Sequence, residues 1–240
     1  MIETLPETGS TNADLLERTR AGMHVSEGTW LVADRQTNGR GRQGREWFDG
    51  HGNFMGSTVV HLSARDPAPA SLALLFGVAL HETVGAMLQQ PYRATLKWPN
   101  DLMVSGAKLA GILLEREGNT IIAGVGVNLS VAPPVSDRRT TAMSSYGPAP
   151  DRNAFAALLA EHVDRELQRW RTYGPEPLIH RWQMAAHPVG APLCVRLPDE
   201  EPIRGAFAGL DKDGALRLTL TSGETRTIHA GDVTLASGKD

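Results

Sequence analysis

The chain has 240 residues, of which 24 are lysine or arginine and 27 are aspartate or glutamate, so its formal net charge is −3. This length accommodates one large domain, or a medium domain and a small one. The charge excludes a protein that binds nucleic acid through overall basicity. The single cysteine, Cys194, excludes an internal disulfide framework. A hydrophobic fraction of 41% supports a sizeable core and argues against general disorder.

The amino-terminal segment carries no targeting signal, because residues 1–18 are acidic and polar and lack both a basic region and an apolar stretch. The longest apolar run, residues 70–88, contains His81, Glu82 and Thr83 in its middle. It therefore predicts a buried helix rather than a membrane span. We expect a soluble, cytoplasmic protein that does not contact a membrane, and a single cysteine fits that reducing compartment.

The spacing of apolar residues predicts a mixture of helices and strands. Residues 37–53, which are rich in glycine and arginine, and residues 131–150, which hold four prolines, show no apolar period and are predicted loops. Ser10 and Thr11 can cap the first helix, and Gly22 can end it. Helices are predicted over residues 13–21, 70–89 and 153–173, and strands over residues 29–33, 54–62, 95–98, 102–104, 108–115 and 120–128.

The pattern changes near residue 187. From there to the end the chain consists of short apolar runs separated by proline or glycine turns, which is typical of a small all-β barrel. We therefore predict two domains, over residues 1–187 and 188–240.

The first motif with chemical content is GRGRQGREW, Gly39 to Trp47. Glycines allow backbone N–H groups to approach phosphate oxygens, and arginines neutralise them. The tryptophan can stack on a purine. A flexible basic loop and an RNA-binding glycine-arginine tract are the alternative interpretations of this motif.

Three further motifs follow in the order KWPND (Lys97 to Asp101), GAKLAGIL (Gly106 to Leu113) and GVGVNLS (Gly124 to Ser130). The first is a turn by default, but its polar residues could line a pocket and help place a metal-bound nucleotide. Lys108 in the second either extends to water or faces an anion inside a cleft. Small alternating residues in the third permit close approach of a ligand, although packing alone also explains them.

The order and joint presence of these motifs resemble biotin–protein ligases. The resemblance covers most of the chain, including a carboxy-terminal part similar to the family's SH3-like domain. It implies a short form without the family's amino-terminal DNA-binding domain, since nine residues precede Ser10, and we expect no DNA partner. The matching motifs are Ser10-Thr11-Asn12, Gly39 to Trp47, Lys97 to Leu102, Lys108 to Leu113, Gly124 to Asn128, Asp213 to Leu218 and His229 to Val233.

The resemblance implies a reaction in two steps. Biotin's carboxylate attacks the α-phosphate of ATP to give biotinyl-5′-adenylate, and a lysine of a biotin carboxyl carrier protein domain then takes the biotinyl group. Such chemistry needs positive charge near the α-phosphate. The resemblance assigns this catalytic work to Lys108 and Arg42, with help from Lys97, and implies Mg²⁺ on the phosphates with Asp101 as a contact, directly or through water.

The same resemblance assigns the binding of biotin and nucleotide to a larger set. Trp47 is expected near the adenine, and the small strand residues are expected to form a wall for biotin. The full set of predicted binding residues is Ser10, Thr11, Asn12, Gln36, Arg40, Gly41, Arg42, Trp47, Asn100, Lys108, Gly124, Gly126 and Asn128.

The implied architecture is α/β (α+β): a central mixed sheet flanked by helices, similar to class II aminoacyl-tRNA synthetases, followed by a small SH3-like barrel. Two other functions remain open at this point. One is a lipoate or octanoate ligase on the same fold, and the other is a non-enzymatic biotin-sensing or RNA-binding protein. The oligomeric state, homodimer or monomer, is open as well.

Overall fold

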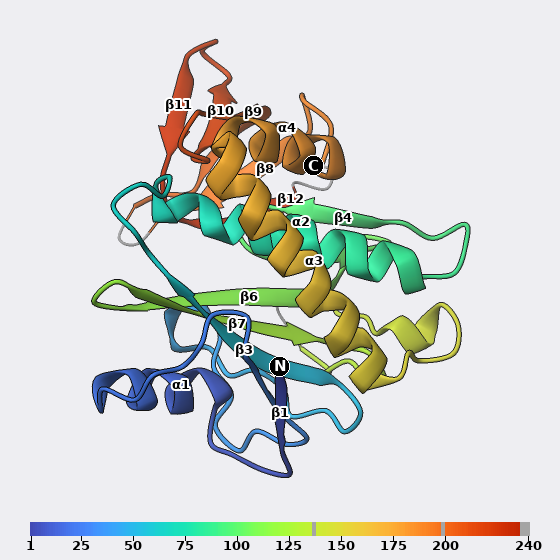
Figure 1. Ribbon diagram of the computed structural model, residues 1–240. Coiled ribbons are helices and arrows are strands. Elements are labelled where there is room, and N and C mark those ends of the chain that lie inside the picture. Colours follow the sequence, from blue (N-terminus) through green and yellow to red (C-terminus); the bar gives the residue numbers. More distant parts are fainter. Residues whose placement is uncertain (136–137, 198–199, 236–240) are drawn as a thin grey trace.

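The computed structural model describes residues 1–135, 138–197 and 200–235. In this part of the chain the strands form a seven-stranded sheet and a five-stranded sheet, with helices packed beside them (Figure 1). The expected combination of a central mixed sheet, flanking helices and a carboxy-terminal all-β unit is confirmed.

The larger sheet is mixed. Its strand order is β1-β2-β3-β7-β6-β5-β4, in which β1 and β2 are parallel and all other neighbours are antiparallel. The long β6–β7 hairpin turns at Gly118-Asn119 as predicted, and Gly118 has a φ of +56°, a conformation that favours glycine. The strands are β1 Ile2–Leu5, β2 Trp30–Ala33, β3 Phe54–His61, β4 Ala94–Lys97, β5 Asp101–Val104, β6 Ala107–Glu117 and β7 Thr120–Val127.

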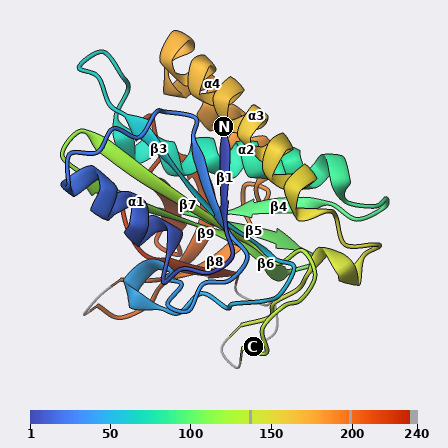
Figure 2. The same ribbon diagram turned by 60° about the horizontal axis from the view of Figure 1, so that its bottom comes forward.

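Alternate residues of this sheet face two different apolar clusters. Trp30 and Val60 join the main core, whereas their neighbours Leu31 and Val59 pack with Leu15 of α1 (Thr11–Arg20) on the other side. This alternation follows from the two-residue period of a strand. Helix α1 therefore covers one face, and α2 (Leu72–Met87), α3 (Arg152–Tyr173) and α4 (Pro175–Ala185) cover the other (Figures 1 and 2).

Helix α2 is apolar on nearly every side because it is enclosed. The segment Pro69–Met87 is long and apolar enough to cross a membrane by length and composition, yet 61% of its most apolar window is buried. It packs against α3, α4 and β4. Such burial is typical of a core helix, and the finding agrees with the prediction made from His81 and Glu82.

The carboxy-terminal sheet is antiparallel, with the order β11-β10-β9-β8-β12. Its apolar residues, such as Val195 and Phe207, belong to the same core cluster as Trp182 of α4. The domain boundary at residue 187 stays a prediction, and residues 236–240 of the expected second domain lie outside the described residues. The strands are β8 Pro192–Arg196, β9 Ile203–Leu210, β10 Leu216–Leu220, β11 Thr225–Ile228 and β12 Asp232–Leu235.

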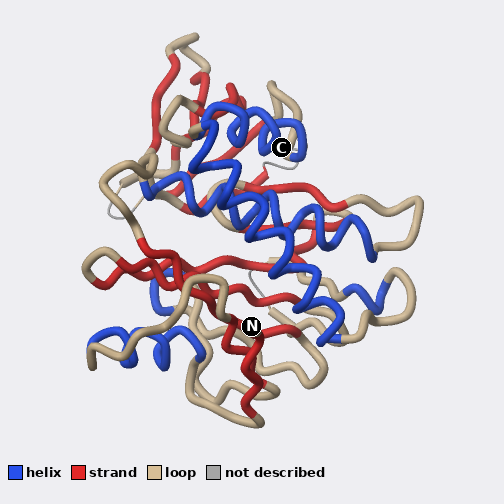
Figure 3. Tube along the Cα trace, viewed as in Figure 1, coloured by secondary structure: helices blue, strands red, loops and turns tan. Residues whose placement is uncertain are grey.

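Three elements were not predicted: β1, α4 and β12. The two strands have four residues each, and each lies at the edge of its sheet, so they have little periodicity of their own. Helix α4 begins with Pro175 directly after Gly174, and a glycine followed by a proline is equally typical of a loop. In their described residues the two predicted loops contain only short 3-10 turns, η1 Arg42–Gly44 and η3 Met143–Ser145 (Figure 3). A third such turn, η2 Pro69–Ser71, precedes α2.

Trp182 gives a direct test of this packing. Its indole is 2% exposed and lies 3.4 Å from the position that a Cβ on Gly77 would take in α2. Trp182→Ala should lower the free energy of unfolding by about 3–5 kcal/mol, because it leaves a cavity between α2, α4 and the second sheet. Urea denaturation measures this. Tyr173→Ala is the control, because that side chain is 70% exposed; equal losses in the two variants would contradict the packing.

Candidate functional site

A cleft of about 710 Å³ lies where the amino-terminal end of α1, the glycine-rich loop, the large sheet and the carboxy-terminal sheet meet. Every residue that the sequence predicted for the site lines it. Arg42 and Lys108, 66 positions apart in the chain, share this single cavity. The predicted residues along its wall are Ser10, Thr11, Asn12, Gln36, Arg40, Gly41, Arg42, Trp47, Lys97, Asn100, Asp101, Lys108, Gly124, Gly126 and Asn128.

A chain of hydrogen bonds arranges the polar end of the cleft. The backbone N–H of Thr11 donates to Gln36 Oε1 at 2.8 Å, and the Thr11 hydroxyl lies 2.6 Å from Ser57 Oγ. Ser57 in turn donates to Asn12 Oδ1 at 2.6 Å. The Thr11 hydroxyl also donates to Gln36 Oε1 at 3.1 Å, so its single hydrogen is shared between Gln36 Oε1 and Ser57 Oγ. Gln36 Oε1 is therefore occupied, and its Nε2 provides the donors that remain.

Ser57 lines the cleft but was not predicted. It lies on β3, is 1% exposed, and faces the start of α1. In the sequence it is one small residue in a buried strand, and only the pairing of β3 beside α1 brings it to the site. Ser10 is the N-cap residue of α1, as expected, but its side chain makes no capping hydrogen bond, so the predicted capping role of that hydroxyl is wrong.

Two glycines of β7 make room for two side chains that line the cleft. A Cβ on Gly124 would lie 2.4 Å from Asn12 Oδ1, and a Cβ on Gly126 would lie 2.2 Å from the indole of Trp47. Neither distance is possible for a real side chain, so these positions require glycine if Asn12 and Trp47 are to lie where they do. The small residues of this strand thus let the protein's own side chains pack closely against it, and close approach of a ligand stays a prediction.

Two buried polar atoms in the cleft have no hydrogen-bond partner within the described residues: Trp47 Nε1, a donor, and Asn128 Oδ1, an acceptor. Buried polar atoms of this kind are rare in folded proteins and call for an explanation. Asn128 uses its Nδ2 to hold the carbonyl of Thr141 at 3.1 Å, which fixes the direction of its oxygen. The pair suits a polar ligand that both accepts and donates.

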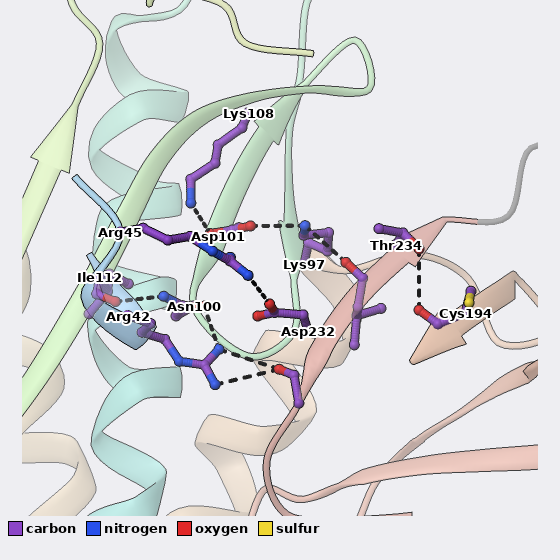
Figure 4. Close-up of polar contacts among 12 residues, drawn as sticks. Arg42, Arg45, Lys97, Asn100, Asp101, Lys108, Ile112, Cys194, Asp232 and Thr234 are labelled. Atoms are coloured by element: carbon purple, nitrogen blue, oxygen red, sulfur yellow. Dashed lines mark hydrogen bonds and ion pairs between the residues drawn. The ribbon is translucent and has the colours of Figure 1, made fainter. Parts of the chain in front are cut away.

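Asp101 lies between two lysines at the other end of the cleft (Figure 4). Its carboxylate oxygens are 2.5 Å from Lys108 Nζ and 2.9 Å from Lys97 Nζ. Burial by itself raises the pKa of the Asp101 carboxyl, but the attraction of the two lysines outweighs it and the pKa lies below the ordinary 3.8. Burial lowers the pKa of Lys108 below its ordinary value, and Asp101 opposes that shift. The three groups together carry one net positive charge into the cleft.

The glycine-rich loop is folded back on itself. The N–H of Gly41 donates to the carbonyl of Arg45 at 2.7 Å, and the N–H of Trp47 donates to the carbonyl of Gly39 at 2.9 Å. These bonds bring Trp47 back over the sheet and present Arg42 at the tip. Lys108 Nζ lies 5.9 Å from the centre of the Trp47 ring, within the range of a cation–π contact.

The carboxy-terminal sheet supplies part of the site, which the sequence did not predict. Arg42 donates to Asn100 Oδ1 at 3.1 Å and reaches the carbonyl of Gly231 at 3.5 Å, while Lys97 donates to the carbonyl of Val233 at 3.1 Å (Figure 4). Arg45 also pairs with Asp232. The segment Gly231–Val233, at the start of β12, therefore holds both the glycine-rich loop and the KWPND turn.

The described residues offer no metal site of their own. No group of three or more histidine, cysteine, aspartate or glutamate side chains within residues 1–135, 138–197 and 200–235 could ligate an ion. Both oxygens of Asp101, the predicted magnesium contact, are bound by lysines. These residues do not fit a magnesium site built from protein ligands, and a contact through water stays a prediction.

Comparison with known proteins agrees with the geometry. Residues 7–131 match the Biotin/lipoate A/B protein ligase family, and residues 195–235 match the Biotin protein ligase C terminal domain. The biotin–[acetyl-CoA-carboxylase] ligase of Mycobacterium tuberculosis is 35% identical, over 97% of this chain and 88% of that protein. The enzyme of the same name from Paracoccus denitrificans is 35% identical, over 95% and 98%.

A solved structure shares the whole fold. The biotin protein ligase from Aquifex aeolicus in complex with biotin and ATP superposes with a TM-score of 0.86 at 25% sequence identity. The match covers 98% of this chain and 99% of that one.

The lysine–aspartate–lysine group predicts a pH-dependent stability. Asp101→Asn should lower the free energy of unfolding at pH 7 by about 3 kcal/mol, because it leaves two half-buried ammonium groups without their counter-charge. The carboxyl pKa is depressed in the folded state, so its stabilisation is complete above the ordinary 3.8 and is lost as the pH falls below it.

The difference in the free energy of unfolding between the wild type and Asp101→Asn should therefore stay constant from pH 7 to about pH 5 and narrow as urea denaturation is repeated down to about pH 2.5. Asp213→Asn is the matched control, because Asp213 pairs with Lys212 at the surface, where both side chains are exposed. A difference that stays constant across this pH range would contradict the role of the Asp101 charge.

Proposed function

The chain belongs to the Biotin/lipoate A/B protein ligase family and is an ATP-dependent biotin–protein ligase, and we propose that the cleft between α1 and the carboxy-terminal sheet is its active site. The observation that carries this proposal is the convergence of Lys108, Arg40 and Arg42 with the polar end of α1 on one cavity. The basic side chains suit the phosphates of ATP, and the start of α1 suits the small polar ring of biotin. A reaction between biotin and ATP requires both regions in one cavity.

The first step forms a mixed anhydride. An oxygen of the biotin carboxylate attacks the α-phosphorus of ATP, the bond to the β-phosphate oxygen breaks, and pyrophosphate leaves with that electron pair. Two anions must meet, so the cleft has to supply positive charge where they join. Lys108 serves this purpose, because it is nearly buried and Asp101 holds it at 2.5 Å. Lys97 is the second lysine on the same carboxylate and supports it.

The second step transfers the biotinyl group to an amine. A neutral lysine of the acceptor attacks the anhydride carbonyl, the C–O bond to AMP breaks, and an amide forms as the amine loses its proton. Water must not reach the anhydride first, so the cleft has to retain it. The folded glycine-rich loop suits this, with Arg42 bound to Asn100 and Gly231 and with Trp47 lying over the sheet.

Biotin fits the polar end of the cleft. Its ureido ring has two N–H donors and one carbonyl acceptor, and it needs a few fixed partners and an apolar wall. We assign the ring to Ser10, Thr11, Asn12, Gln36 and Ser57, with the β7 glycines as the wall. Asn128 and Arg40 line the same cavity, and the Arg40 side chain lies near Glu115.

Magnesium belongs with ATP rather than with a protein cage. Mg²⁺ usually keeps several waters and binds substrate phosphates with the help of one or two carboxylates. We propose that it enters on the triphosphate, with Asn100 or Asp101 as outer contacts through water. ATP and biotin are the small-molecule substrates.

We propose a biotin carboxyl carrier domain of a biotin-dependent carboxylase as the acceptor, and the cytoplasm as the place of reaction. Support comes from the M. tuberculosis and P. denitrificans relatives, whose name specifies acetyl-CoA carboxylase. The match of residues 195–235 to the carboxy-terminal domain of biotin protein ligases favours biotin over lipoate. Incubation with ATP, Mg²⁺, a carrier domain and either biotin or lipoate tests this; labelling by lipoate alone would contradict it.

Lys108→Ala should abolish pyrophosphate release while the chain stays folded. Asp101 keeps Lys97 as a partner in this variant, so no unpaired charge is left behind. Loss of the positive charge at the reacting oxygen is expected to slow adenylate formation by about 100-fold or more. A coupled pyrophosphate assay measures the rate and circular dichroism measures folding. Lys212→Ala, at a fully exposed lysine, is the control, and near-normal pyrophosphate release in Lys108→Ala would remove Lys108 from the mechanism.

Arg42→Gly should release the adenylate faster and label lysines indiscriminately. The substitution removes the hydrogen bonds from the loop tip to Asn100 and Gly231, which together with the Arg45–Asp232 ion pair hold the loop over the cleft. Dissociation of radiolabelled adenylate and biotinylation of an unrelated protein are the measurements. Arg65→Gly, in an exposed loop away from the cleft, is the control. Unchanged dissociation together with carrier-specific labelling would count against this role for Arg42.

A further inference from the structure

Glu115 lies on β6 just outside the cleft and contacts two residues that line it. Its Oε2 accepts a hydrogen bond from Asn12 Nδ2 at 2.8 Å, and its Oε1 is 3.6 Å from Arg40 Nη2. Its side chain is 25% exposed, against 40% for Arg40. None of the motifs singled out in the sequence includes Glu115, and the mechanism above does not use it.

The contact with Asn12 decides which way the amide faces. A carboxylate can only accept hydrogen bonds, so the NH₂ group of Asn12 must be the end that faces Glu115. The oxygen then faces the opposite way, toward Ser57, which donates to it, and toward Gly124, whose missing Cβ makes room for it. If the amide were turned around, its oxygen would face the Glu115 carboxylate, and neither group would have a hydrogen to donate.

This orientation sets the chemistry that the cleft offers. With Oδ1 held toward Ser57, Asn12 keeps a second lone pair as an acceptor for a ligand N–H. The reversed amide would instead offer a donor. A ligand with two N–H donors needs acceptors in the cleft, so the orientation of the Asn12 amide changes the affinity for that ligand.

The contact of Glu115 with Arg40 contributes less free energy than its contact with Asn12. Its separation of 3.6 Å is longer than a hydrogen bond, both partners are partly exposed, and ion pairs of this kind add little free energy. The charge of Glu115 therefore matters less than its ability to accept from Asn12, and this difference can be measured.

We propose that Glu115 is a positioning residue that fixes the amide of Asn12 as an acceptor and thereby tunes the affinity of the cleft for biotin. The proposal rests on the proposed function and deepens it. Glu115 acts through Asn12 and does not itself touch the substrate. Its removal should change biotin binding and leave the rate of the bound complex nearly unchanged.

A matched control exists on the same two elements. Glu117, two residues further along β6 and on the same face of the strand, pairs with Arg20 at the other end of α1 at 2.8 Å. Glu115 and Glu117 thus each join β6 to α1, one at the end next to the cleft and one away from it. Glu117→Ala loosens the attachment of the helix without affecting Asn12.

The experiment compares Glu115→Ala, Glu115→Gln and Glu117→Ala. Titration calorimetry gives the Kd for biotin, and pyrophosphate release at saturating ATP gives kcat and the KM for biotin. Glu115→Ala should raise Kd and KM by about tenfold, as expected when a hydrogen bond to a charged group is lost, while kcat changes by less than about twofold. Glu115→Gln should restore most of the affinity, because its amide oxygen still accepts from Asn12. Glu117→Ala should bind like the wild type.

A double-mutant cycle tests whether the effect passes through Asn12. In an Asn12→Ala background, Glu115→Ala should add less than about twofold to Kd. A full tenfold further increase in Kd would overturn the proposal. So would a loss of biotin affinity in Glu115→Gln, or in Glu117→Ala, equal to that in Glu115→Ala. The two proposals can fail separately. If the wild-type protein binds no biotin, the proposed function is wrong. If the wild type binds biotin and Glu115→Ala binds it equally well, only the positioning role of Glu115 is wrong.

Discussion

The shared carboxylate of Asp101 is the interaction on which the rest of the site depends. Lys97 of β4 and Lys108 of β6, on either side of β5, could not lie together in a partly buried cleft without a negative charge between them, since each would repel the other and lose hydration. With Asp101 present, the group stays compact and still carries one net positive charge. The β4–β5 turn that holds Lys97 and Asp101, and the start of β6 that holds Lys108, are thereby fixed next to the place where anions react.

The opposite end of the cleft relies on neutral hydrogen bonds rather than charge. Thr11, Ser57 and Asn12 form a chain of hydrogen bonds, and Gln36 closes it from the loop side by accepting from Thr11. A cleft with a positive end and a polar end suits a molecule that carries a carboxylate on one side and a ureido ring on the other.

The carboxy-terminal sheet belongs to the working part of the molecule. Its apolar residues share the main core, and its segment Gly231–Val233 contacts Arg42, Arg45 and Lys97. Most of these contacts use backbone carbonyls, so they place few demands on side-chain identity. That explains why the sequence pattern around His229 to Val233 indicated a family resemblance without indicating any part in the site.

Much of this protein can be predicted from its sequence, because the relevant signals are local. The α2 and α3 helices, the β6–β7 hairpin and the motif residues each depend on spacing within a short stretch, and the joint order of the motifs indicated the family. The edge strands β1 and β12, the buried hydroxyl of Ser57 and the carboxylate of Glu115 had no such signal. Tertiary structure alone decided their roles. A short edge strand forms only when its neighbouring strand is in place. The hydrogen bonds of Asn12 to Ser57 and to Glu115 span 45 and 103 positions, so they depend on which strands pair beside α1.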